Sequence, residues 1–456
     1  MTALRLAPYI DAERDRIVDA LLDWLRIPSI SSLPEHVDDV QASAAWCAAR
    51  CAEAGFEHVE VVPTPGHPAV YADWLHAGAG APTVLVYGHH DVQPVDPLEL
   101  WRHPPFDPAI VDGECLARGA IDDKGQVLYE IEAARGLLRV EGRLPVNLKF
   151  LIEGEEEVGS PHFEALLASR PAQFGCDVVV VSDTGMWAPD VPSTCVGMRG
   201  LVAFDVVLRT ADGDLHSGLF GGAVANPLHL AARLADALHD ERGQVTLPGF
   251  YDRVRPVGPD EEASLARLPF DEAAWAAEAG ALHLEGEEGW STLARIGYRP
   301  TAEVVGLHGG YGGEGIKTIV PATANLKVTF RLVADQRPDE VEAAFHAWVA
   351  ERVPAGVEVT VTPLGGVAPA LTPVDHPAVG ALSRAIERVW GTAPLFTREG
   401  GSGPEEALGR VLDAPVLFLG VGLPGDRLHA PNERMVMDQF WKGLLAAGEL
   451  WHELAP

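Results

Sequence analysis

Cysteine is scarce in this chain of 456 residues, which holds Cys47, Cys51, Cys115, Cys176 and Cys195. The number is odd, and no two of them have the CxxC spacing of a zinc knuckle or a redox motif. A disulfide framework is therefore not expected, and the pattern is typical of a protein whose thiols stay reduced in a cytoplasm. Cys47 and Cys51 lie four residues apart on a predicted helix, where two buried core residues explain the spacing better than a metal clip.

Basic residues and long apolar runs are also in short supply. The 34 Lys and Arg against 66 Asp and Glu give a net charge of −32, which repels a polyphosphate backbone, so nucleic acid is not expected as a partner. No stretch approaches the ~20 apolar residues that span a bilayer, and the N-terminal segment lacks the apolar region of a signal peptide. No membrane association is expected, and the predicted location is the cytoplasm.

The length exceeds what one hydrophobic core usually supports, so at least two domains are expected. The first 197 residues alternate apolar β runs with helical patterns, which predicts a mostly parallel α/β sheet covered by helices. The predicted strands are 84–87, 147–152 and 178–181, and the predicted helices are 36–54, 125–140 and 161–169.

The character of the sequence changes over residues 198–366. Strands are predicted at 201–210, near 301–307, at 324–333 and at 357–364, with helices at 226–239 and 338–353 and an irregular acidic segment at 240–300. The resulting β-α-β-β-α-β order is that of a ferredoxin-like α+β domain. The α/β pattern resumes over residues 367–456 with a helix at 376–390, a strand at 415–421 and a helix at 437–453. We therefore expect one α/β domain interrupted by a smaller inserted domain.

Side chains that bind metals follow the predicted strands of the α/β domain. His89 and Asp91 follow VLVYG, Glu155 to Glu157 follow NLKFLIEG, Asp183 follows VVVVS, His429 follows VLFLGVGLPGDRL, and Asp122 and Asp123 precede the helix at 125. In open α/β sheets, sites form beyond the carboxyl ends of the strands. Five such clusters in one domain predict a common site.

The composition of these clusters indicates the chemistry. Imidazole and carboxylate ligands without cysteine suit zinc, or manganese and cobalt. Two histidines with three or more carboxylates exceed the needs of one tetrahedral ion but match two ions that share a carboxylate. A further carboxylate is then free to act as a general base, and the adjacent Glu156 and Glu157 supply one base and one ligand. Asp91 is well placed to accept the second ring N–H of His89.

These residues also carry a resemblance to a known family. The resemblance extends from about residue 20 to 450, and it is carried by the motifs GHHDVQP, RGAIDDKG, IEGEEEVGS, VVSD, DLHSGLFGG, FRLV, TREGGSGPEE and LHAPNE, which occur in this order. They resemble the carnosinase-type cytosolic dipeptidases, within the metallopeptidase family of aminoacylase, carboxypeptidase G2 and succinyl-diaminopimelate desuccinylase. The resemblance implies one metal on His89 and Asp183, a second on Glu157 and His429, a bridge by Asp122, and Glu156 as the general base.

For the inserted domain, the resemblance implies a lid that also forms a homodimer. His216 then reaches the site of the partner subunit and stabilises the oxyanion, while Arg331, Thr318 and Ser402 hold the C-terminal carboxylate of a dipeptide or very short peptide. The implied reaction is hydrolysis of the amide bond by an exopeptidase with two divalent metal ions, most simply Zn²⁺.

Several alternatives stay open at this stage. His90 competes with His89 as the ligand, and Glu155 competes with Glu156 as the base. Each remaining candidate has a purely structural reading: a capped loop for His216, an ion pair for Arg331, a helix N-cap for Ser402, and a helix N-terminal acid for Asp123.

The nearest functional rival is an N-acyl-amino-acid deacylase, which would use the same metal site. A serine hydrolase is disfavoured because the chain has no GxSxG elbow. A non-catalytic scaffold would be expected to lack Glu156 or one of the ligands, and all of them are present.

Overall fold

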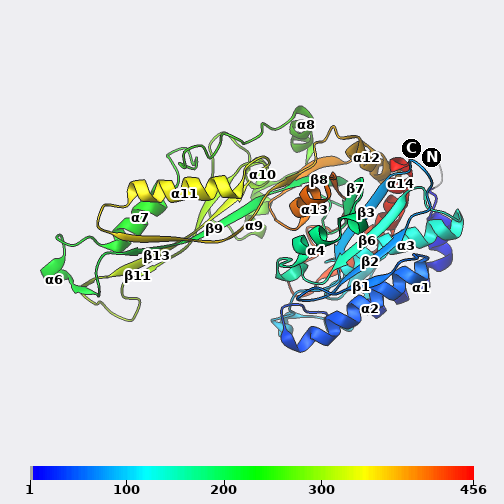
Figure 1. Ribbon diagram of the computed structural model, residues 1–456, viewed down its shortest axis with the longest axis horizontal. Coiled ribbons are helices and arrows are strands. Elements are labelled where there is room, and N and C mark those ends of the chain that lie inside the picture. Colours follow the sequence, from blue (N-terminus) through cyan, green and yellow to red (C-terminus); the bar gives the residue numbers. More distant parts are fainter. Residues whose placement is uncertain (1–3) are drawn as a thin grey trace.

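The central element is a six-stranded sheet in the computed structural model, which describes residues 4–456 (Figure 1). Its order is β1 (Glu60–Val62), β2 (Ala69–Trp74), β6 (Asn147–Glu153), β3 (Thr83–His89), β7 (Val178–Val181) and β17 (Val416–Phe418). The last four strands run parallel, and β1 and β2 join antiparallel at one edge. The expected mostly parallel α/β sheet is confirmed.

The strands are buried on both faces because helices cover each of them. Along β3, Val84 and Val86 pack into one core while Leu85 and Tyr87 pack into the other. The first face is covered by α1 (Ala7–Leu25), α2 (Val37–Ala54), α3 (Lys124–Val140), α12 (Pro377–Trp390) and α14 (Met437–Leu454). The second face is covered by α4 (Phe163–Ser169), α5 (Pro171–Phe174) and α13 (Glu405–Leu412). Continuous apolar strands such as VVVV are the expected result.

A second, antiparallel sheet extends away from the first (Figure 1). Its order is β11 (Thr301–Gly309), β13 (Thr323–Leu332), β9 (Gly200–Arg209) and β14 (Glu358–Val367). The helices α7 (Pro227–Ala237) and α11 (Pro338–Arg352) share a separate core with one face of this sheet, centred on Phe204, Phe330, Phe345 and Trp348. Burial along β9 alternates, which is typical of a sheet packed on one side only.

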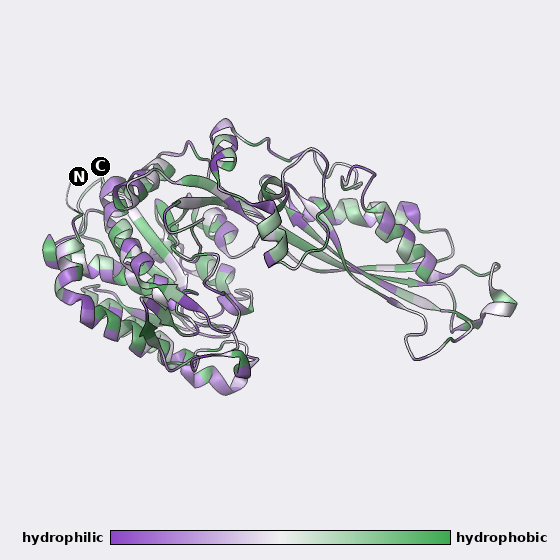
Figure 2. Ribbon diagram, turned by 180° about the vertical axis from the view of Figure 1, so that it is seen from behind, coloured by the Kyte–Doolittle hydropathy of each residue, from purple (hydrophilic) through white to green (hydrophobic). Residues whose placement is uncertain are grey.

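Figure 2 shows outer helices that alternate between hydrophilic and hydrophobic residues, as helices with one buried face do. None of the helices in residues 4–456 is both long and apolar enough to cross a lipid bilayer.

The prediction missed the shortest elements. One small sheet consists of β15 (Ala370–Leu371), β8 (Ser193–Met198) and β16 (Leu395–Glu399). A second consists of β18 (Arg434–Val436), β5 (Glu114–Leu116) and β4 (Ala109–Val111). The third pairs β10 (Leu215–His216) with β12 (Ile319–Val320). The short helix α6 (Ser217–Phe220) follows β10.

The acidic segment 240–300, predicted as irregular, contains the short helices α8 (Pro259–Arg267), α9 (Glu272–Glu278) and α10 (Thr292–Gly297). Two of them are started by side-chain caps, because Asp271 accepts the N–H of Ala274 and Ser291 accepts that of Ala294. Helices of six to nine residues are too short to reveal an apolar period in the sequence.

Candidate metal centre

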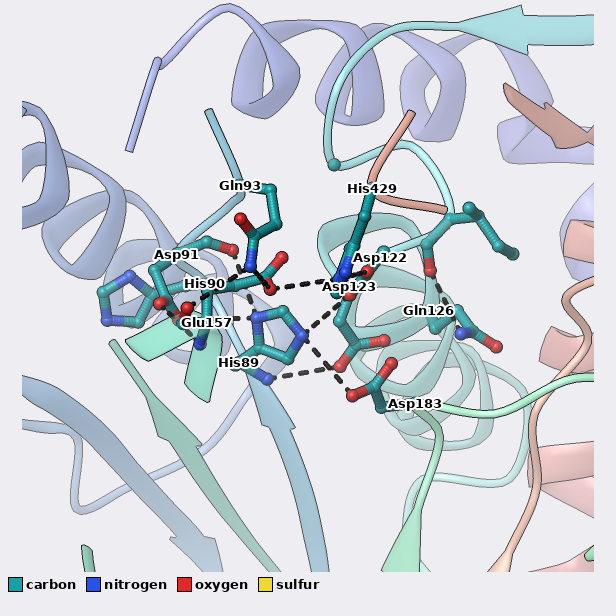
Figure 3. A network of polar contacts seen from close by, with 12 residues as sticks. His89, His90, Asp91, Gln93, Asp122, Asp123, Gln126, Glu157, Asp183 and His429 are labelled. Carbon is teal, nitrogen blue, oxygen red and sulfur yellow. Dashed lines mark hydrogen bonds and ion pairs between the residues drawn. The ribbon is translucent and has the colours of Figure 1, made fainter. Parts of the chain in front are cut away.

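The acidic and histidine clusters meet at the carboxyl edge of the parallel sheet (Figure 3). His89 ends β3, Asp183 follows β7 by two residues, and Asp122 lies just before α3. Glu156 and Glu157 form a short 3₁₀ turn (Glu156–Val158) after β6. The strands bring these residues together because parallel neighbours end at the same edge of the sheet.

One group of ligand atoms consists of His89, Asp122 and Asp183, and these atoms all lie within 4.8 Å of one another. His89 Nε2 lies 3.0 Å from Asp122 Oδ1 and 3.5 Å from Asp183 Oδ2. His89 is fully buried, so the sheet fixes the position of its ring.

A second group consists of Asp122, Glu157 and His429 within the same limit. His429 Nε2 lies 2.9 Å from Asp122 Oδ2 and 3.1 Å from Glu157 Oε2. The two carboxylate oxygens of Asp122 therefore face two different histidines. This is the arrangement of a carboxylate shared between two adjacent sites.

Neighbouring side chains hold these groups in place. His89 Nδ1 lies 3.4 Å from Asp91 Oδ1 and 3.1 Å from the Asp91 carbonyl oxygen. The other oxygen of Asp91 accepts the backbone N–H of Glu157 at 3.1 Å, and Gln93 Nε2 donates to Glu157 Oε2 at 2.7 Å. Asp91 thus connects the two groups. An acceptor on Nδ1 directs Nε2 of His89 towards Asp122 and Asp183.

Glu433 is a supporting residue that sequence reasoning missed. Its fully buried carboxylate accepts backbone N–H groups from Gly119, Ile121 and Asp122 at 3.0, 3.0 and 3.2 Å, and Arg118 Nη1 donates to it at 2.6 Å. Glu433 therefore fastens the loop that carries Asp122 to the loop that carries His429. The motif LHAPNE contains it, but nothing in the sequence shows that its partners are backbone groups 311 to 314 residues away.

The structure also separates the competing candidates. His90 Nε2 contacts the carbonyl oxygen of Pro68 at 2.9 Å, and its ring points away from the two groups (Figure 3). Burial lowers the pKa of His90 to about 4. Glu155 accepts from His162 at 2.9 Å and faces neither group. Asp123 precedes α3 without capping it, because its carboxylate accepts the backbone N–H of His89 at 3.2 Å.

The electrostatics of the centre favour positive charge. Contacts with Asp122 and Glu157 raise the pKa of His429 to about 10. Burial lowers the pKa of His89, but the carboxylates of Asp122 and Asp183 outweigh it, so the pKa is well above its ordinary value. Burial raises the pKa of Asp122, but the two histidines hold it below its ordinary value. These carboxylates therefore create a site that stabilises cations.

The donor set fits divalent metal ions. The ligand atoms are imidazole nitrogens and carboxylate oxygens, with no thiolate among them. Glu157 Oε1, Asp91 Oδ1 and Asp123 Oδ1 are buried without a hydrogen-bond partner in residues 4–456. Unpaired buried acceptors cost free energy unless another group satisfies them, and a cation held by Glu157 would do so at the second group.

Glu156, which directly precedes Glu157, lines a cavity of about 450 Å³. Burial raises the pKa of its carboxyl, and the nearby Asp183 and Glu157 act in the same direction while His89 opposes them. Ser402 lines the same cavity. It is no helix N-cap, because α13 begins three residues later and the Ser402 hydroxyl instead contacts Arg331 Nη1 at 3.1 Å.

The remaining candidates lie elsewhere in the chain. His216 and Thr318 are exposed at the far tip of the antiparallel sheet, beside α6 (Figure 1). The two segments are neighbours, because Ser217 N donates to the Thr318 carbonyl at 3.0 Å. His216 Nδ1 accepts the N–H of Gly218 at 3.0 Å, as in the capped loop considered above. Within one chain, the fold therefore does not bring His216 or Thr318 to Arg331 and Ser402.

Comparison with known proteins identifies the family. The profile of Peptidase family M20/M25/M40 matches residues 85–453. The chain belongs to this family. It is 28% identical over 455 residues to the Beta-Ala-His dipeptidase of Rattus norvegicus, covering 95% of this chain and 92% of the relative. It is 28% identical to the Cys-Gly metallodipeptidase dug1 of Schizosaccharomyces pombe, covering 100% and 99%.

Among solved structures, the M20 family metallo-carboxypeptidase Sso-CP2 from Sulfolobus solfataricus is similar, with a TM-score of 0.83 and 30% identity over 96% of this chain and 99% of that one. The predicted resemblance to M20-type dipeptidases is thereby confirmed. This M20 peptidase is a hydrolase of peptide bonds, and the family implies divalent metal ions.

Proposed function

We propose that this M20 peptidase is a dinuclear metallo-exopeptidase that hydrolyses dipeptides or very short peptides with a free C-terminal carboxylate. The observation that carries the proposal is Asp122, whose two oxygens face His89 and His429 in two adjoining groups of ligand atoms. His89 and Asp183 would hold one ion, Glu157 and His429 the other, and Asp122 would bridge them. Zinc suits this donor set best, with manganese and cobalt as alternatives.

When bound, the ions supply Lewis acidity, which polarises the scissile carbonyl and makes water a stronger acid. Glu156 is the proposed general base, since it lines a cavity and its carboxyl interacts electrostatically with residues of both groups. It takes a proton from water and gives the proton to the leaving amine. Burial raises the pKa of Glu156, which helps it to retain the proton until the amine accepts it. Asp91 keeps Nε2 of His89 directed into the site.

Arg331 and Ser402 would select the free carboxylate of the leaving residue. Arg331 forms no ion pair with a carboxylate of residues 4–456, so the structural alternative of an ion pair has no support there. A guanidinium group matches a carboxylate with paired N–H donors. Arg331 donates to Ser402, which lines the same cavity as Glu156, and this connection suits a substrate with a carboxylate close to the scissile bond.

The proposed assembly is a homodimer. Residues 1–197 and 367–456 would form the catalytic domain, and residues 198–366 the lid and dimerisation domain. His216 and Thr318 sit at the far tip of the latter (Figure 1), which suits residues that serve the site of a second copy. Because Nδ1 of His216 accepts an N–H, the neutral ring carries its proton on Nε2 and can donate to an oxyanion. Thr318 would help to hold the carboxylate from the same tip.

We place the enzyme in the cytoplasm, where its substrates are small peptides. All five cysteines are free, and four of them are buried, which fits a reducing compartment.

The test is amine release by the purified, metal-loaded protein from matched panels of dipeptides and N-acetyl amino acids. Chelator-treated protein serves as the control. We expect cleavage of the dipeptides and loss of that cleavage on chelation. Preference for the acetylated panel would favour the alternative, an N-acyl-amino-acid deacylase. The similarity to a Beta-Ala-His dipeptidase and a Cys-Gly metallodipeptidase supports hydrolysis of dipeptides.

A further inference from the structure

A second arginine lies beside Arg331 at the junction of the two sheets. Arg331 occupies β13 opposite Leu201 of β9, and Arg199 directly precedes β9. The backbone N–H of Arg199 donates to the carbonyl oxygen of Glu399 at 3.1 Å, which ties this segment to the end of β16. Three segments that are distant in sequence therefore converge on the loop that carries Ser402.

The hydroxyl group of Ser402 connects both arginines. Ser402 Oγ donates to the backbone carbonyl of Arg199 at 2.6 Å and accepts from Arg331 Nη1 at 3.1 Å. The single hydroxyl proton is thus engaged with the protein. Ser402 thereby links the backbone of Arg199 to the guanidinium group of Arg331.

Among the residues that the structure describes, neither guanidinium group is paired with an anion. No carboxylate of residues 4–456 forms an ion pair with Arg199 or Arg331, and Arg199 Nε is buried without any hydrogen-bond partner. Burial and then the charge of Arg331 lower the pKa of Arg199 to about 10, with Glu303 on β11 acting in the opposite direction. Two unpaired cations side by side repel one another, and an anion from outside would relieve that repulsion.

A nearby arginine shows that the chain does neutralise such groups elsewhere. Arg398 on β16 is held by both oxygens of Glu261 at 2.7 and 2.8 Å. Arg199 lies at the same junction, but no carboxylate of residues 4–456 forms an ion pair with it. An arginine without a carboxylate partner is notable in this chain, because its net charge of −32 reflects an excess of carboxylates.

The space around Arg199 is also adapted to its guanidinium group. An ideal Cβ at Gly400 would lie 2.7 Å from Arg199 Nη2, so any side chain there would displace the arginine. The adjoining Ser402 lines the cavity that contains Glu156. An anion bound between the arginines would therefore be held at the edge of the cleft in which hydrolysis is proposed.

We infer that Arg199 is a second carboxylate-binding residue, which grips the C-terminal carboxylate of the substrate together with Arg331. This inference rests on the proposed function and adds a residue to it. A carboxylate has two oxygens and several lone pairs, so it accepts N–H groups from two guanidiniums at once. The ligand class is a small molecule with a free α-carboxylate next to the scissile amide.

The test compares a dipeptide with the same dipeptide as its C-terminal amide, in steady-state kinetics with the metal-loaded enzyme. Arg199→Met should raise KM for the free acid by roughly 10- to 100-fold, as expected for the loss of a charged hydrogen bond, and leave kcat nearly unchanged because binding alone is weakened. KM for the amide should move little. Arg199→Lys should give a smaller rise, since it keeps the charge but loses the planar fork. Arg209→Met, at the other end of β9, is the control and should behave as wild type.

An equal change for acid and amide, or an unchanged KM for the acid, would overturn the role of Arg199. A wild-type enzyme that cleaves both forms equally well would instead overturn the carboxylate requirement of the proposed function, and the inference with it. A crystal of the wild-type protein with a free amino acid product tests the same point without any variant. We expect both guanidiniums within hydrogen-bond distance of the carboxylate. Contact with Arg331 alone would contradict the inference.

Discussion

The carboxyl edge of the parallel sheet and the tip of the antiparallel sheet differ in how they hold their functional residues. At the first, His89 and Asp122 are buried and each has several fixed partners. At the second, His216 and Thr318 are exposed, and their contacts come from the adjoining turn. One chain can therefore build the proposed metal centre alone, whereas the residues of the tip lie away from that centre (Figure 1). The predictions below test this division.

The largest effect should follow removal of the proposed base. Glu156→Gln should lower kcat by roughly 100- to 10,000-fold, the usual contribution of a general base, while both metal ions stay bound. Metal content measured by elemental analysis should equal that of wild type. Glu53→Gln, at an exposed glutamate of α2, is the control. Undiminished activity in Glu156→Gln would assign the base to another residue.

The second largest effect on activity is expected at the tip of the antiparallel sheet. His216→Ala should lower kcat by roughly 100- to 1,000-fold, as loss of an oxyanion donor does. Mixing it with Glu156→Gln should restore about a quarter of wild-type activity, since half of randomly formed dimers are mixed and each holds one intact site. His346→Ala, on α11 of the same region, should not impair activity. Verified mixed dimers without recovery would mean that each subunit serves its own site.

A smaller effect is expected for the support of Asp122. Glu433→Gln should weaken metal binding by roughly 10- to 100-fold, because an amide presents an NH₂ group where the carboxylate accepts backbone N–H groups. Calorimetric titration of the metal-free protein measures this directly. Glu132→Gln removes another buried carboxylate, one that pairs with Arg16 and Tyr9 away from the centre. If both variants lose affinity equally, the effect is one of general stability.

The last prediction concerns the pH dependence of stability and leaves catalysis aside. Glu130 on α3 is buried and accepts from Ser182 at 3.0 Å, and burial raises its pKa to about 8. The folded protein therefore keeps a proton that the unfolded chain loses above its ordinary value of 4.5. Stability should fall as pH rises between these values, by at most about 1.4 kcal/mol per pH unit. Glu130→Gln should flatten that slope in denaturant titrations, and an unchanged slope would contradict the assignment.

Most of the parallel-sheet region could be predicted because its strands are buried on both faces and read as continuous apolar runs. The pairing of β1 with β2 and the three small sheets could not, since strands of two to six residues carry little pattern. The ligand clusters were visible because each follows a predicted strand. Glu433 was not, because its partners are backbone groups that only the folded chain brings near. The same holds for Arg199, because only the folded chain shows that no carboxylate of residues 4–456 forms an ion pair with it.

The measurement that tests the central claim most directly is anomalous diffraction from crystals grown with zinc. The account predicts two peaks in each chain, one among His89, Asp122 and Asp183 and the other among Asp122, Glu157 and His429, with Asp122 between them. A single peak, or peaks away from Asp122, would contradict a dinuclear centre bridged by this residue.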